Sequence, residues 1–133
     1  MLLDKTITSY TNSNITSIPA SLFQSCSALT TALFPSVTRI GAYAFSGCSA
    51  LTTISFPVAQ VIGNSAFTNC SSLTNVFFPK ATTISGSAFL NCDALISISF
   101  PSVINLESYA FRKCSALTIA SFPVATHIGV SAF

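Results

Sequence analysis

The sequence predicts a β-rich solenoid, a single domain of stacked coils, and two observations lead to this fold class. Cysteine recurs at a fixed interval of 22 residues, as do phenylalanine and proline: the cysteines are Cys26, Cys48, Cys70, Cys92 and Cys114. A fixed period between about 20 and 50 residues is typical of solenoids. Each copy also opens with alternating apolar and polar residues that end at a proline, which indicates a short strand. No single copy can bury its own apolar residues, so we expect the coils to stack around one core.

The repeat divides the chain into a short N-terminal tail and one array. Residues 1–6 lie outside the repeat, and residues 7–133 form a single solenoid of about six coils. The first copy is degenerate, because Asn12 and Ser13 stand where later copies have phenylalanine and proline. The copies span 7–28, 29–50, 51–72, 73–94, 95–116 and the incomplete 117–133. We therefore expect the chain to be a fragment of a longer array.

The copy at 51–72 shows how one coil is built. Leu51–Phe56 alternates apolar and polar residues, which predicts a strand that Pro57 ends. Ile62 and Gly63 indicate a turn, and the segment 65–70 is expected to form a short 3₁₀ or single α-turn. The predicted inward side chains of this copy are Leu51, Ile54, Phe56, Ala59, Ile62, Ala66, Phe67 and Cys70.

Phenylalanine supplies most of the predicted core. Of 12 phenylalanines, all but Phe77 fall in two columns, one containing Phe56 and the other Phe67. Burying one large apolar side chain contributes roughly 1.5–3 kcal/mol, so these columns dominate the driving force for folding. Parallel strands about 4.8 Å apart would then form a continuous ladder along the whole solenoid.

The five cysteines are expected to form a column of small buried hydrophobic residues, since they occupy one equivalent position in successive coils. Parallel side-chain directions disfavour a disulfide between neighbouring coils. A linear column cannot close a tetrahedral metal site, and we predict no metal.

Composition excludes several classes of partner. Only 6% of residues are charged and the formal net charge is +2, with no basic run for a nucleic-acid backbone. The high apolar content is interrupted everywhere by Ser, Thr, Asn or Pro, which argues against membrane insertion. The first ten residues lack the pattern of a signal peptide.

The residues that carry catalytic chemistry are few and scattered. His127, the sole histidine, falls at a variable turn position, in a different column from the cysteines. Asp4, Asp93 and Glu107 are too widely spaced for a paired acid and base mechanism. No phosphate-binding glycine motif is present. We therefore predict no catalytic residue, no enzyme activity and no cofactor.

The motif L-x-x-I-x-F-P-x-[VA]-x-x-I-G-x-x-A-F-x-x-C, seen from Leu51 to Cys70, resembles the leucine-rich repeats of BspA-like surface proteins. The resemblance covers Ile7 to Phe133. It implies a right-handed leucine-rich-repeat superhelix with a parallel sheet on the concave side. It also implies a cell-surface or secreted adhesin that contacts host matrix proteins or other cells, with no catalytic residues to carry over.

The strand positions whose side chains face away from the core form the candidate binding surface. This surface is mostly a neutral hydroxyl face, interrupted by Leu33 and Phe77, and an exposed phenylalanine on a rigid sheet is a typical interface anchor. The candidate residues are Thr31, Leu33, Thr53, Ser55, Asn75, Phe77, Ser97, Ser99, Ile119 and Ser121.

Three functions compete at this point. The first is an interaction module that binds a protein or glycan through the sheet face. The second is a structural spacer stalk with no ligand of its own. Ice binding is the third, but Asn75, Phe77 and Ile119 break the regular threonine array that it requires. The terminal coils show no polar cap, so end-to-end self-association is also expected.

Overall fold

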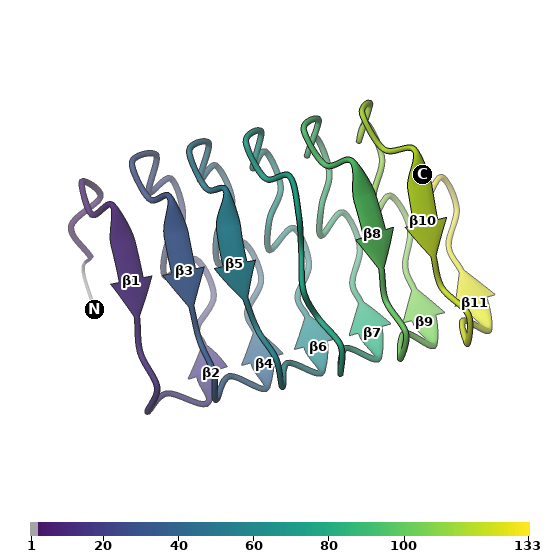
Figure 1. Cartoon of the computed structure of the whole chain (residues 1–133), viewed down its shortest axis with the longest axis horizontal. Helices are drawn as coiled ribbons and strands as arrows, with labels where there is room; N and C mark the ends of the chain where they lie inside the picture. The colour runs from purple at the N-terminus through teal and green to yellow at the C-terminus, as the bar shows by residue number, and fades with distance from the viewer. Residues whose placement is uncertain (1–2) are drawn as a thin grey trace.

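Residues 3–133 are described by a computed structural model and form a parallel β-solenoid (Figure 1). Their regular structure consists of short strands joined by turns, with one row of strands at the front and a second row behind. Within these residues there is no helix long and apolar enough to span a membrane. The first two residues of the predicted tail lie outside the described residues.

The front strands confirm the predicted strand position, although each is shorter than predicted. They are β1 (Ser9–Thr11), β3 (Thr31–Leu33), β5 (Thr53–Ser55), β8 (Ser97–Ser99) and β10 (Ile119–Ser121). They pair in parallel with a register of one repeat, as in Thr31 with Thr53. Ile54 and Phe56 are buried as predicted.

The expected continuous front ladder is wrong, because the coil at 73–94 has no front strand. The front strands form two separate sheets, β1-β3-β5 and β10-β8. Figure 1 shows the unpaired segment as a plain trace between β5 and β8. The backbone of residues 74–78 has one hydrogen bond to a neighbouring coil, in which the Ile96 N–H donates to the Thr74 carbonyl at 3.4 Å. The break coincides with Phe77, the bulkiest side chain at the fifth position of any copy.

The continuous ladder lies instead on the back, where we predicted a turn. Each coil contributes a two-residue strand to a six-stranded sheet. These strands are β2 (Ser17–Ile18), β4 (Arg39–Ile40), β6 (Val61–Ile62), β7 (Thr83–Ile84), β9 (Asn105–Leu106) and β11 (His127–Ile128). The next residue continues the pairing, as when the Gly63 N–H donates to the Ile40 carbonyl at 2.9 Å. The back sheet therefore keeps the coils in register across the front break.

The third side of each coil is a run of turns with 3₁₀-type hydrogen bonds, in which Thr68 N–H donates to the Ser65 carbonyl and Cys70 N–H to the Phe67 carbonyl, both at 3.2 Å, but these turns do not join into a helix. Two residues in each complete coil adopt a left-handed conformation, for example Ser65 at φ 55° and Asn69 at φ 62°. This conformation costs a non-glycine residue roughly 1–2 kcal/mol. It directs the backbone N–H groups along the solenoid axis, where Ser65 donates to Gly86 at 3.0 Å and Asn69 to Leu90 at 2.9 Å. Hydrogen bonding between coils offsets the local cost.

The two phenylalanine columns interlock in the core. Phe67 stacks on Phe45 and Phe89, with ring centroids 5.1 and 5.2 Å apart, and meets Phe56 and Phe78 edge to face at 6.1 and 6.0 Å. Both arrangements are favourable for aromatic pairs. The fully buried members are Phe23, Phe34, Phe45, Phe56, Phe67, Phe78, Phe89, Phe100 and Phe111. The predicted packing of the columns is confirmed.

The first coil closes the N-terminal end of this core. Tyr10 takes the place of the phenylalanine missing at Asn12, and its ring stacks on Phe34 with a centroid distance of 5.6 Å. The Lys5 ammonium donates to the Gln24 carbonyl. In later coils the equivalent carbonyl accepts a backbone N–H from the preceding coil, as Ser46 does from Ser25. Residues 3–6 of the predicted tail thus contribute to an end cap.

Candidate functional site

The ten candidate binding residues all lie on the outward side of the front strands or of the unpaired segment at 75–77. Seven are exposed and three, Thr31, Leu33 and Ser55, are half-buried. The strand pairing places equivalent residues side by side, as in Ser97 beside Ile119 and Ser99 beside Ser121. We call this surface the front face. Its role in binding stays a prediction.

Two large apolar side chains stand out on the front face. Phe77 is 57% exposed and Ile119 is 64% exposed. Phe77 comes from the unpaired segment and Ile119 from β10, two coils further along. Ser97 and Ser99 of β8 lie between them. An apolar residue therefore borders the serines on each side.

A hollow on the front face lies over these serines. Its volume is about 460 Å³, and every residue that lines it is uncharged. We call this hollow the trough. It is lined by Asn75, Val76, Phe77, Phe78, Pro79, Ser97, Ile98, Ser99, Pro101, Ile119 and Ser121.

The break in the front sheet explains why the face is hollowed here. A second hollow of about 430 Å³ lies on the other side of the unpaired segment, between it and β5. Val76 is half-buried, whereas Ile54 and Ile98 at the equivalent position of neighbouring coils are buried. The core widens too, since Phe78 and Phe100 are 6.0 Å apart while Phe56 and Phe78 are 5.4 Å apart.

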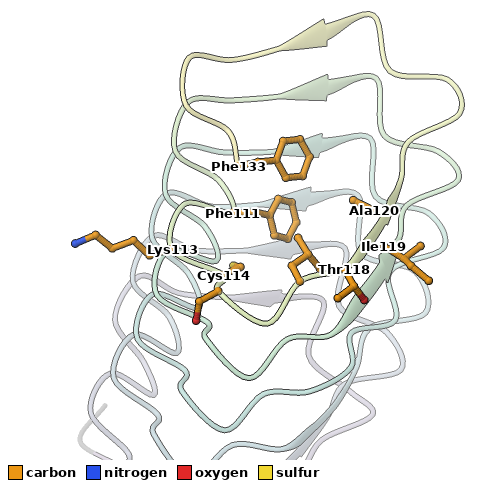
Figure 2. A pocket seen from close by; sticks show the side chains of 9 residues that line it. Phe111, Lys113, Cys114, Thr118, Ile119, Ala120 and Phe133 are labelled. Carbon is orange, nitrogen blue, oxygen red and sulfur yellow. The ribbon is translucent and has the colours of Figure 1, made fainter.

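The C-terminal end carries a different hollow, of about 430 Å³ (Figure 2). The rings of Phe111 and Phe133 and the side chain of Cys114 lie around it, while Lys113 points away. Phe133 is 55% exposed, and β10 has no neighbour on its outer edge. This hollow is the open cross-section of the core.

The N-terminal hollow has a mostly apolar lining and a volume of about 470 Å³. Leu3, Tyr10, Ile15 and Leu22 are among its lining residues, and all four pack against the core. It therefore lies beneath the end cap formed by the first residues.

The cysteine column is structural, as predicted. All five thiols are free and buried. Four of them donate to a phenylalanine carbonyl of the preceding coil, as Cys48 does to Phe23 at 3.1 Å and Cys70 does to Phe45 at 3.2 Å. Desolvation raises the pKa of Cys48 to about 12 and that of Cys114 to about 11. Thiols with such pKa values are poor nucleophiles and poor metal ligands at neutral pH.

The other titratable groups are dispersed. His127 lies exposed in β11 rather than in the predicted turn, and its strand neighbour is Asn105. A Glu107 carboxylate oxygen accepts a hydrogen bond from the Gly86 N–H at 3.0 Å, which is a structural role. Hydrogen bonds from the Thr6 hydroxyl and N–H lower the pKa of Asp4. Within residues 3–133, no cluster of three or more His, Cys, Asp or Glu side chains has the arrangement of a metal site.

The back sheet is a second outward surface that the sequence did not predict. Its outward positions are Ser17, Arg39, Val61, Thr83, Asn105 and His127. A hollow of about 520 Å³ lies over its N-terminal half, lined in part by Arg39, Val61 and Asn64. The only signal for this surface was a dipeptide per copy, too short to show alternation.

Comparison with known families supports the resemblance seen in the repeat. A sequence model described as "BspA type Leucine rich repeat region (6 copies)" matches residues 38–133. A comparison with curated proteins finds no match.

Solved structures of bacterial proteins share the fold. The chain is similar to a leucine rich cell surface protein from Faecalibacterium prausnitzii A2-165, with 30% identity and a TM-score of 0.81 over 88% of this chain and 32% of that one. A leucine-rich repeat protein from Eubacterium ventriosum is 30% identical, with a TM-score of 0.82 over 90% of this chain and 34% of that one. The T. pallidum Leucine Rich Repeat protein is 25% identical, with a TM-score of 0.73 over 86% of this chain and 67% of that one. The chain thus spans about a third of the length of the first two proteins.

Proposed function

Because this chain belongs to the BspA-type leucine-rich repeat family, we propose that it is a binding module of a cell-surface or secreted protein. Its front face would hold a protein or glycan partner. The leucine-rich repeat fold generally serves protein interaction, and one similar solved structure is a leucine rich cell surface protein. The family is generally non-enzymatic, which supports a binding role over catalysis.

One observation carries this proposal: the repeat separates packing from recognition. The residues that recur from copy to copy, such as Phe56, Phe67 and Cys70, are buried. The outward positions of the front strands instead carry hydroxyl, amide, aliphatic and aromatic side chains that differ from coil to coil. A rigid scaffold with variable outward positions is how solenoid proteins build a binding surface.

The test places a bulky charge on the front face and measures binding. The probes are a panel of immobilised extracellular matrix proteins and an array of oligosaccharides. The front variant combines Thr53→Arg with Ser97→Arg, both at exposed sites. The control is Gln60→Arg, an exposed position at the turn before β6. All variants should unfold at the same denaturant concentration, because surface substitutions usually change stability by less than about 0.5 kcal/mol.

For any probe that binds the unmodified chain, we expect the front variant to lose that binding and the control to keep it. Equal binding by the front variant and the unmodified chain would contradict the proposal. If no extracellular probe binds, the alternative of a spacer stalk without a ligand gains support.

A further inference from the structure

The trough on the front face has features that select one class of partner. These features are an uncharged lining, a row of serine hydroxyl groups between two apolar residues, and a broken strand along one side. We propose that the trough binds a segment of a neutral saccharide. This inference rests on the proposed binding function and names the partner and the place.

The outward side chains at the trough form a grid of three coils by two positions. Phe77 and Ile119 occupy opposite corners, while Asn75 and Ser121 occupy the other two. Ser97 and Ser99 lie in the middle row. Paired strands lie about 4.8 Å apart and the break at 75–77 adds to this spacing, so the outer rows are at least about 10 Å apart, which leaves room for a ring-sized group between them.

The chemistry of these side chains matches that of a sugar. A sugar ring has C–H groups on its faces and hydroxyl groups around its rim. The negative face of the Phe77 ring attracts the C–H groups of a stacked ring, and the serine hydroxyls and the Asn75 amide can both donate to and accept from sugar hydroxyls.

The broken strand adds further hydrogen-bonding groups. In the paired front strands, backbone N–H and carbonyl groups are used between coils, as when Phe34 donates to Ser55 at 3.1 Å. The peptide groups of 75–77 have no strand partner in either neighbouring coil. The hydroxyl groups of a saccharide would pair with these peptide groups, which no neighbouring strand uses.

The absence of charge along the trough argues against an acidic partner. Every lining residue is neutral, so a sialic acid or a sulfated sugar would lose hydration there without gaining an ionic partner. The lining also mixes apolar side chains with serines and Asn75 and is open to solvent rather than enclosed, whereas protein anchors contribute most in fully desolvated pockets.

An array of neutral and acidic oligosaccharides tests the inference, followed by calorimetric titration of the best binder. The variants are Phe77→Ala and the double variant Ser97→Ala with Ser99→Ala. The control is Val124→Ala, which removes a 48% exposed apolar side chain at the turn after β10, outside the trough. Circular dichroism and urea unfolding verify that all variants are folded.

We expect a neutral oligosaccharide to bind, with affinity falling about tenfold or more for Phe77→Ala. The serine double variant should weaken binding further than the control does. Binding unchanged by Phe77→Ala would overturn the site while leaving the binding function intact. Binding of acidic sugars alone, or loss of a protein probe rather than a sugar with Phe77→Ala, would overturn the partner class. Binding of neither class of probe would overturn both proposals.

Discussion

Removing one ring from the centre of the phenylalanine columns should cost far more than removing the exposed one. Phe67 has no exposed surface and contacts four other rings at 5.1–6.1 Å. Phe67→Ala removes those contacts and leaves a cavity, at a cost of about 3–5 kcal/mol. The cost is a large part of the roughly 5–15 kcal/mol that stabilises a typical domain. Phe77 lies in the next coil and is 57% exposed, so Phe77→Ala should cost less than about 0.5 kcal/mol.

Urea unfolding followed by circular dichroism measures this difference. With a slope of about 2 kcal/mol per molar urea, Phe67→Ala should lower the midpoint by about 1.5–2.5 M and Phe77→Ala by less than about 0.3 M. Phe133→Ala, at the open end with 55% of its surface exposed, should fall between the two. Similar midpoints for Phe67→Ala and Phe77→Ala would refute the assignment of the columns as the main source of stability.

Three further predictions follow from the turns, the thiols and the open end. Gly63→Ala should lower the free energy of unfolding, measured by heat or urea, by about 1–3 kcal/mol, because the added Cβ would lie 2.6 Å from the Ile40 carbonyl oxygen. The matched control is Gly86→Ala, which should be neutral because the nearest atom to its added Cβ is 3.4 Å away. Stability should fall as the pH rises above about 8.5, by about 1.4 kcal/mol per pH unit for each thiol, since unfolded thiols ionise there while burial keeps the folded pKa of Cys48 near 12. Cys48→Ser should reduce the loss of unfolding free energy per pH unit by the contribution of one thiol. An unchanged loss per pH unit would exclude the thiols as its cause. Sedimentation velocity should show self-association of this 133-residue chain with increasing concentration through the open edges of β10 and β11, and a clean monomer at high concentration would exclude it.

The core could be predicted from the sequence because each repeated residue type has one packing requirement. Once Phe56, Phe67 and Cys70 recur at the same interval, stacking them is the way to remove them all from water. The ten outward residues followed from the same alternation, and all ten lie on the front face.

Three features escaped prediction for physical reasons. The back strands, such as Val61–Ile62, have two residues, and a pattern of period two cannot be recognised over so short a segment. The break at 75–77 depends on how neighbouring coils fit together, because the segment Leu73–Phe78 is as apolar as other predicted strands. Tyr10 fills the place of a missing phenylalanine from two residues away, which requires a backbone path that the repeat register does not contain.

The central claim is that the recurring residues pack the solenoid while the outward positions of the front face bind its partner. A scan that substitutes every residue of the copies at 51–72 and 73–94, read for both protease resistance and ligand binding, tests the claim most directly. The expected result is loss of stability at buried positions such as Ile62 and Phe67, and loss of binding without loss of stability at outward positions such as Thr53 and Phe77. Loss of binding without loss of stability at positions away from the front face, or loss of stability at the outward positions equal to that in the core, would contradict it.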